Sequence, residues 1–344
     1  MKKLLCFSAL AVLVISACNL ADITGNDVIL DDDAEMGVVT FSLSGNDDPL
    51  VTKSSSQAAE SAVRSLQVLV FNSGGNLVSY ASSTSNAVSA SVPLNINGHK
   101  VFAVTNVSED LSSCSSPSAL TSRISYLKDN SLEALQMIGS VDNQTFTSGS
   151  TVPVEVRRFA SKVEIDEIVS AFTAAAHKSQ EFKIKGIYLI NVNGSSPYTQ
   201  VSTPGVWYNQ LQYVSGDCNS LISDIFQAPV TVQTSSGAVT SYKTKHYFYC
   251  YSNPASVDTH GGTFSPRRTR LVIETVLGST TYYYPIDIVG NGNTLDPNTS
   301  YTVTKLTITG PGVEHPDDPL NTGSVSFNVT VKNWDTGFSK TVTY

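Results

Sequence analysis

Short stretches in which apolar and polar residues alternate recur along this chain, and they constrain its fold more than any other feature. Val39, Phe41 and Leu43, for example, are each followed by a polar residue. Because successive side chains of a strand point to opposite faces, this spacing predicts a strand with one buried face. Clusters of Gly, Pro, Asn and Ser separate such stretches, which favours antiparallel sandwiches over parallel βαβ units. The further predicted strands are 66–71, 77–80, 88–94, 101–104, 182–192, 245–251, 271–276, 281–288, 302–309, 325–331 and 338–344.

The length of the chain indicates two domains of this kind. A chain of 344 residues is too long for one ordinary sandwich, and hydrophobic residues at 41% are enough to build a large core. We place the boundary near Pro153, so the predicted N-terminal sandwich is 37–154 and the C-terminal sandwich is 155–344. The expected fold class is therefore all-β, with two antiparallel β-sandwich domains in tandem.

The hydrophobic period changes between Pro117 and Met137, where a short helical excursion is expected. Ser116 is a candidate N-cap, and Pro117 at the first helical position loses no hydrogen bond there. The residues spaced for short helices are Leu120, Ile124, Leu127, Leu132 and Leu135.

The first residues predict export. Two lysines precede an apolar run that ends in Ile15-Ser16-Ala17-Cys18, which has the form of a bacterial lipobox. The run is short for a membrane span, so 1–17 reads as a lipoprotein signal peptide and Cys18 as the acylated residue. An ordinary signal peptide with a chance cysteine is the alternative. Residues 18–36 form an acidic tether that spaces the protein from the membrane.

Composition and motifs argue against several function classes. The net charge is −8 and no basic stripe is present, so nucleic-acid binding is not expected. The five histidines are isolated, and no H-E-x-x-H, G-x-S-x-G or C-x-x-C motif occurs. We therefore expect no enzyme activity, no cofactor and no metal site.

Two features leave alternatives open. The runs 247–249 and 282–284 are rich in tyrosine and could stack on a sugar, although strand core and rim explain them more simply. After lipidation of Cys18, three cysteines remain, so at most one disulfide is possible and Cys218 with Cys250 is conceivable.

Predicted strands near the two ends of the sequence are consistent with one mode of assembly. Val325, Phe327, Val329 and Val331 share one face of a terminal hairpin, and their burial is worth about 6–12 kcal/mol. Near the other end, a loop with Lys53 follows the 39–43 strand. A cut in this loop would free the strand and open an apolar groove, which is the arrangement used in donor-strand complementation.

The residues that carry a family resemblance are 298–312, with Pro316, Pro319 and the hairpin containing Trp334, together with 63–72, 101–106 and 158–165. Through them the chain resembles the Bacteroidia-type fimbrillins, the stalk subunits of type V pili. The resemblance implies two transthyretin-like domains and transport to the outer membrane as a lipoprotein. It also implies removal of the N-terminal segment by a trypsin-like protease, followed by strand exchange into a cell-surface polymer.

By position, the resemblance places the cut between Lys53 and Ser54, with Arg64 as second choice, so that the strand segment 37–53 is removable. The implied displaced residues are Val39, Phe41 and Leu43, and the implied donor residues are Val325, Phe327, Val329, Val331, Phe338, Val342 and Tyr344. The expected partners are other copies, other fimbrial subunits, the protease and outer-membrane lipid, in support of adhesion. Two rival interpretations of the chain remain. It could be an anchor or tip subunit of the same pilus, or it could be a surface glycan-binding lipoprotein.

Overall fold

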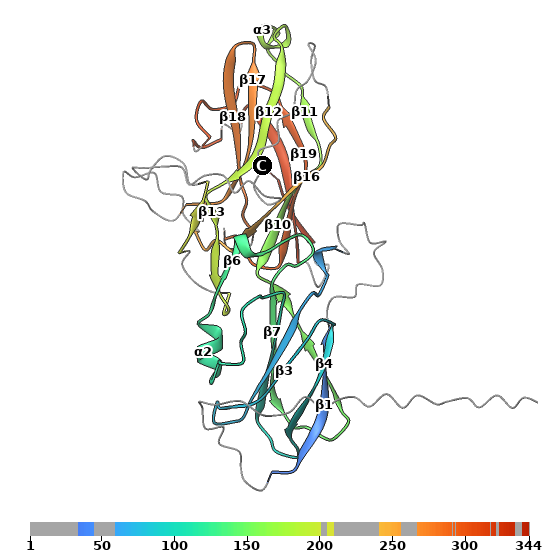
Figure 1. Ribbon diagram of the computed structural model, residues 1–344. Coiled ribbons are helices and arrows are strands. Elements are labelled where there is room, and N and C mark those ends of the chain that lie inside the picture. Colours follow the sequence, from blue (N-terminus) through green and yellow to red (C-terminus); the bar gives the residue numbers. More distant parts are fainter. Residues whose placement is uncertain are drawn as a thin grey trace, which may run out of the picture.

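The structure is a computed structural model that describes residues 34–44, 59–200, 205–209, 241–255, 267–290, 292, 294–316, 318–320, 323–333 and 339–343. The described chain forms an elongated body (Figure 1). Strands from the first half of the sequence, in blue to green, gather at one end, and strands from the second half, in yellow-green to red, gather at the other (Figure 1). No helix among the described residues is long and apolar enough to cross a membrane.

Two sheets make up the first half, with strand orders β4-β1-β8 and β3-β2-β5-β7-β9. Val39 and Phe41 of the first sheet and Val68 and Val70 of the second belong to one buried apolar cluster, which we call the lower core. The strands are β1 (Met36–Ser44), β2 (Leu66–Phe71), β3 (Leu77–Ser83), β4 (Ala87–Pro93), β5 (His99–Thr105), β7 (Met137–Gln144), β8 (Thr151–Glu155) and β9 (Arg157–Arg158).

The second half is built around one larger sheet and one of three strands. The larger sheet has the order β16-β10-β19-β20-β21, with β11 also paired to β19, and the smaller sheet has the order β12-β17-β18. Their strands are β10 (Ala160–Ile165), β11 (Ile168–Ser170), β12 (Phe182–Ile190), β16 (His246–Tyr251), β17 (Arg270–Leu277), β18 (Thr280–Asp287), β19 (Thr299–Ile308), β20 (Val325–Asn333) and β21 (Ser339–Thr343). Val163, Phe248, Val303 and Phe327 lie in the core of this half.

The two halves are joined by pairing as well as by the chain. A short strand of the first half, β6 (Ile124–Tyr126), pairs with β14 (Ser195–Pro197) of the second. The Tyr251 hydroxyl lies 2.5 Å from the Ser125 hydroxyl and accepts a hydrogen bond of 2.7 Å from the Asn130 amide. The remaining short elements are β13 (Val192–Asn193), β15 (Trp207–Tyr208), α3 (Ala175–Lys178) and the 3₁₀ turn η1 (Leu127–Asp129).

The all-β prediction is confirmed, and the predicted strands fall within or beside observed ones. Three pairings are parallel, between β1 and β8, between β10 and β19, and between β11 and β19. Alternation along one strand does not specify the direction of its neighbour, so these could not be predicted from the pattern. β9 still pairs with β7 of the first half, and β10 pairs with β19 of the second. The chain therefore passes from one half to the other between β9 and β10.

The helical excursion is shorter than the spacing suggests. Only α2 (Pro117–Thr121) is an α-helix, and the Ser116 side chain caps it by accepting from the Ala119 backbone N–H, as expected. The prediction fails at Ile124, because that residue belongs to β6 and pairs with Pro197. Leu120, Leu127 and Leu135 are buried in one apolar cluster that also contains Leu69 and Phe71 of β2, so their spacing reflects a shared core and not a continuous helix.

The position of Phe41 gives a test of this arrangement. Its side chain is 1% exposed and meets the Phe146 ring edge to face at 5.8 Å. We expect Phe41→Ala to lower the free energy of unfolding by about 3–5 kcal/mol in urea titrations, since it leaves a large cavity. Val38→Ala on the outward face of the same strand, where Val38 is 57% exposed, should cost less than about 1 kcal/mol. Equal losses would contradict the assignment of the faces.

Candidate functional site

The first described strand occupies the centre of its sheet. β1 pairs antiparallel with β4 from Met36 to Ser42 and parallel with β8 from Thr40 to Ser44. Its blue arrow runs beside β4 at the lower end of the molecule (Figure 1). Neither neighbour pairs with the other, so β1 alone satisfies the backbone groups on both inner edges. Without β1, this sheet would have a gap one strand wide.

The inward positions of β1 match the residues predicted for a displaced strand. Val39 is fully buried, Phe41 is almost fully buried, and Leu43 packs against the same cluster while partly exposed. Position 37 is closely approached, because a Cβ on Gly37 would lie 2.6 Å from Cδ1 of the buried Leu94, whose side chain would have to move to admit it. The space occupied by β1 therefore has a defined shape along its length.

The predicted processing residues separate into two groups. Cys18, Lys53 and Ser54 lie outside the described residues. Arg64 is described, and its side chain is 61% exposed, with an ion pair of 2.5 Å to Glu133. The backbone around it is held in place, since the Asn106 side chain accepts from the Arg64 N–H at 2.7 Å and donates to the Ala62 carbonyl at 2.9 Å.

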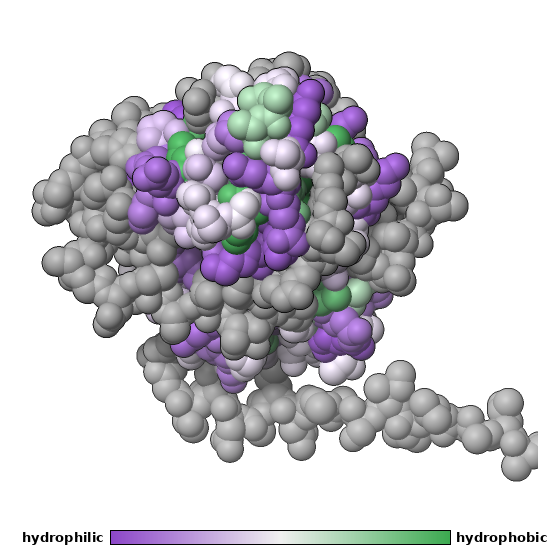
Figure 2. Space-filling view, turned by 90° about the horizontal axis from the view of Figure 1, so that it is seen from above, coloured by the Kyte–Doolittle hydropathy of each residue, from purple (hydrophilic) through white to green (hydrophobic). Residues whose placement is uncertain are grey.

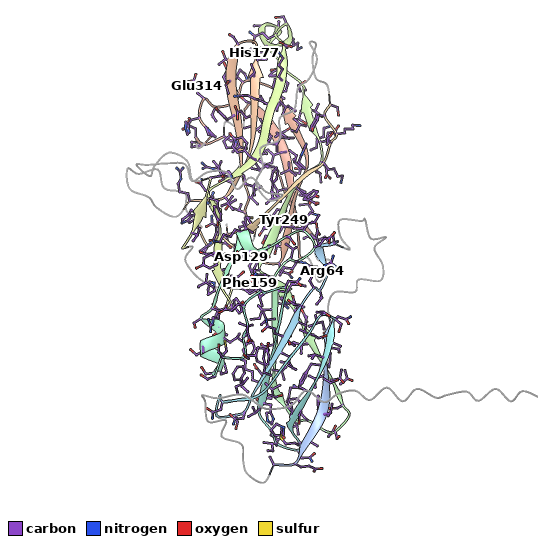
Figure 3. All side chains as sticks on the ribbon, in the orientation of Figure 1. Arg64, Asp129, Phe159, His177, Tyr249 and Glu314 are labelled. Carbon is purple, nitrogen blue, oxygen red and sulfur yellow. The ribbon has the colours of Figure 1, made fainter. Side chains whose placement is uncertain are left out.

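A buried cluster next to this segment was not predicted from the sequence. Glu60 is 2% exposed, and its carboxylate accepts from Lys162 Nζ at 2.8 Å and from the Tyr249 hydroxyl at 2.5 Å. Lys162 also contacts the Glu164 carboxylate at 2.8 Å and lies over the Tyr247 ring. Figure 3 shows Tyr249 at the junction of the two halves, with Arg64 close by. We call Glu60, Lys162, Glu164 and Tyr249 the junction cluster.

The charges of the junction cluster stabilise one another. Burial by itself would lower the pKa of Lys162, but the carboxylates of Glu164 and Glu60 more than offset it, so this pKa lies above its ordinary value. Burial, with the nearby Glu60 carboxylate, raises the pKa of Tyr249, so its hydroxyl stays a donor. Arg158, 4% exposed, adds a hydrogen bond from Nε to the Glu60 carbonyl at 3.2 Å. The segment that begins at Glu60 is thus fixed to the second half.

The predicted donor residues of β20 are already in use within this chain. Val325, Phe327 and Val329 are buried against the core of the second half, and Val331 packs against the same core while partly exposed. β20 pairs with β19 on one side and β21 on the other, and β21 ends the described sheet. Phe338 and Tyr344 lie outside the described residues, and Val342 lies in β21 opposite Val329.

The aromatic runs do not form an open platform for a sugar. Phe248, Tyr249 and Tyr284 are buried, and Lys162 covers the ring of the half-buried Tyr247. At the end of the molecule that carries α3, polar and apolar residues are interspersed on the visible surface (Figure 2). Core packing explains Phe248, Tyr249 and Tyr284, and Tyr282 packs against the same core while partly exposed.

The described residues contain no group of three or more His, Cys, Asp or Glu that could hold a metal ion. Cys114 and Cys250 are free thiols in the core, and burial raises the pKa of Cys250 to about 12, so this thiol stays protonated and unreactive. Cys218 lies outside the described residues.

Comparison with solved structures links this fold to surface appendages. The chain resembles a candidate cell adhesion protein of Bacteroides eggerthii, with 19% identity and a TM-score of 0.65 over 88% of this chain and 97% of that one. It resembles a fimbrilin of Porphyromonas gingivalis, with 14% identity and a TM-score of 0.61 over 87% and 98%. The tip fimbrial protein Mfa3 of the same organism matches at 15% identity and a TM-score of 0.53 over 86% and 99%. No protein-family model and no curated protein matches the chain. The chain thus has the fold of fimbrilins.

The junction cluster predicts a specific stability difference. Lys162→Met keeps most of the side-chain length but leaves Glu60 buried without its cation, so we expect a loss of about 3–5 kcal/mol in the free energy of unfolding. Lys183→Met is the matched control, because Lys183 is 43% exposed and pairs with Glu181 at the surface. Its loss in the same urea titration should stay below about 1 kcal/mol. Similar losses in both variants would contradict a structural role for the cluster.

Proposed function

We propose that this chain is a structural subunit of a cell-surface fimbria, exported as a lipoprotein through Cys18. In this proposal two tandem sandwich domains, 37–154 and 155–344, form each subunit, and a trypsin-like protease removes the segment that ends at Lys53. Subunits then join by strand exchange with other copies and with other fimbrial subunits, and the polymer supports adhesion. The proposal needs no cofactor and no enzymatic activity.

The position of β1 is the observation that carries the proposal. β1 is central in its sheet, yet the chain that follows it, 45–58, contains the predicted cut. Cleavage would turn a covalently held strand into one held by non-covalent contacts alone. Burial of Val39, Phe41 and Leu43 contributes about 4.5–9 kcal/mol at roughly 1.5–3 kcal/mol for each residue. The uncut subunit would therefore be a stable monomer, and the cut strand would leave when another strand displaces it.

The junction cluster favours Lys53 over Arg64 as the processing site. A protease needs several residues in extended form on both sides of the bond that it cuts, and such segments come from chain that is not tied down by burial and hydrogen bonding. Arg64 lies between Glu60, buried in the junction cluster, and the β2 strand, and Asn106 binds the backbone in between. A cut after Arg64 would also remove Glu60 and leave Lys162 with one fewer carboxylate.

The same fold occurs in a fimbrilin and in a tip fimbrial protein, so the place of this subunit along a fibre is argued from its own ends. An anchor or tip subunit is expected to lack either the processing site or the donor tail. This sequence carries Lys53 after its first strand and an alternating hairpin at 325–344. These two features together favour a stalk subunit.

Replacing Lys53 tests the proposal directly. In the native host, Lys53→Ala should abolish the new N-terminus at Ser54 and the ladder of polymer on non-boiled gels, because β1 stays covalently attached. Arg64→Ala is the matched control and should leave both unchanged. If Lys53→Ala still yields ladders whose subunits begin at Ser54 or later, Lys53 is not the switch.

Lipid anchoring has a separate test. Cys18→Ser should leave an unlipidated precursor that labelling reagents do not reach at the cell surface, because stable anchoring depends on acyl chains in the bilayer. Cys114→Ser, in the buried core, is the control and should keep normal surface labelling if the protein folds. Normal labelling of the Cys18→Ser strain would contradict the lipobox assignment.

A further inference from the structure

The junction cluster holds one amine between two carboxylates. Nζ of Lys162 lies 2.8 Å from Oε1 of Glu60 and 2.8 Å from Oε1 of Glu164. The two carboxylates differ in their surroundings, because the Glu60 side chain is 2% exposed and the Glu164 side chain is 28% exposed. The buried carboxylate and the partly exposed one can therefore play different chemical roles toward the same amine.

The buried carboxylate is positioned for attack by this amine. A contact of 2.8 Å between Nζ and Oε1 places the carboxyl carbon of Glu60 roughly 3.5 Å from the nitrogen, at the upper end of near-attack distances. The Tyr249 hydroxyl donates to the same oxygen, Oε1, at 2.5 Å. Arg158 fixes the backbone of Glu60 through the hydrogen bond from its Nε to the Glu60 carbonyl. The carboxyl group thus lies between a fixed amine and a fixed hydrogen-bond donor.

The pair is also shielded from water. Lys162 is buried, and the ring of Tyr247 lies over its Nζ with the ring centroid at 5.3 Å. Tyr249 on the other side of the Glu60 carboxylate is fully buried. Exclusion of water strengthens the electrostatic interactions of the cluster and protects an amide product from hydrolysis. The surface pair of Lys183 and Glu181, by contrast, is open to solvent.

We propose that Lys162 and Glu60 condense to an isopeptide bond, with Glu164 as the base and Tyr249 as the donor to the oxyanion. The bond ties the segment before β2 to β10 and so joins the two halves covalently. Strands β2 to β9 lie between the linked residues, so the closed loop contains every described strand of the first half except β1. Closing so long a loop restricts the unfolded chain. The inference depends neither on strand exchange nor on the proposed function.

The reaction balances within the cluster. The Lys162 ammonium passes one proton through the Glu164 carboxylate to Oε2 of Glu60, which gives a neutral amine and a neutral carboxylic acid. The amine attacks Cδ of Glu60, and the negative charge that develops on Oε1 is stabilised by the Tyr249 hydroxyl. Glu164 takes a second proton from Nζ and delivers it to Oε2. The bond between Cδ and Oε2 then breaks and one water leaves, so an ammonium and a carboxylate have become an amide without oxidant or cofactor.

The ammonium is the resting form of Lys162 before the bond forms. Burial favours the neutral amine, but the carboxylates of Glu164 and Glu60 outweigh it, so the pKa of Lys162 lies above its ordinary value. Since the proton must move before the nitrogen can attack, the bond forms slowly, after the chain has folded. The product is therefore expected in the mature protein.

Tryptic peptides of the full-length protein and of its surface form, purified from the native host and denatured, test the bond. Trypsin does not cut after an acylated lysine, so the bond predicts one branched peptide that joins 54–64 to 159–178 and is lighter than their sum by one water. Without the bond, the same digest yields the linear peptides 54–64 and 159–162. Trypsin itself cuts after Lys53, so the readout does not depend on processing in the host.

Two variants separate the chemistry from folding. Glu164→Gln keeps the length of the side chain and an acceptor oxygen but removes the base, so a protein with unchanged circular dichroism should give linear peptides alone. Glu181→Gln, at the surface pair with Lys183, is the matched control and should give the branched peptide at the parent level.

Three results would overturn the inference or one of its parts. Linear peptides alone from the parent chain would show that Glu60 and Lys162 form an ion pair only. A linear 54–64 beside a 159–178 peptide lighter by one water would place the bond at Glu164 and not at Glu60. The branched peptide at its parent level in Glu164→Gln would exclude Glu164 as the base.

Discussion

The pairing of β1 with two strands that do not pair with each other is the constraint on which the first half of the structure depends. β4 and β8 each use β1 for their inner hydrogen bonds, and the lower core uses it to cover Val68 and Val70 of β2. A strand in this position cannot be lost without unpaired backbone and an open core. Any strand that takes its place must satisfy an antiparallel ladder on one side and a parallel ladder on the other.

A central strand of this kind can be exchangeable only if the chain beyond it is anchored independently. The junction cluster supplies that anchor, because Glu60 is tied to Lys162 and Tyr249 in strands of the second half. Asn106 holds the next few residues, up to the start of β2. The pairing of β6 with β14 and the Tyr251 hydroxyl contacts link the same two halves elsewhere. Without β1, the segment from Glu60 to β2 would therefore still be held to the second half by these contacts.

The sequence predicted the features that repeat with a short period and missed those that join distant segments. The strands at 39–43 and 325–331 follow from alternation, and the cap at Ser116 follows from local capping chemistry. Glu60 and Tyr249 lie 189 residues apart, and nothing near either one signals their hydrogen bond. A signal for Glu60 was present only as an isolated acidic residue in an otherwise apolar and small-residue stretch.

The parallel pairings and the burial of the leucines at 120, 127 and 135 outside a continuous helix were not predicted, and the physical reason is the same. Both depend on what packs against a surface. β2 is buried on both faces, with Val68 and Val70 in the lower core and Leu69 and Phe71 in the second cluster, which also contains those leucines. A run that is apolar at every residue indicates that both faces of the strand are buried, but it does not predict which elements cover each face. Hydrophobic spacing therefore located the strands well and placed the connecting segments less well.

The apolar face of β20 cannot cover two cores at once, and this makes the uncut chain self-contained. While β1 fills its own sheet, a second copy offers no open site to β20, and the best position for Val325, Phe327 and Val329 is beside β19. Removal of β1 would open a second possible site for β20. That site is the gap between β4 and β8 inside one sheet, whereas its present position is near the end of another sheet. In the proposed assembly, removal of β1 would therefore decide when one subunit can join the next.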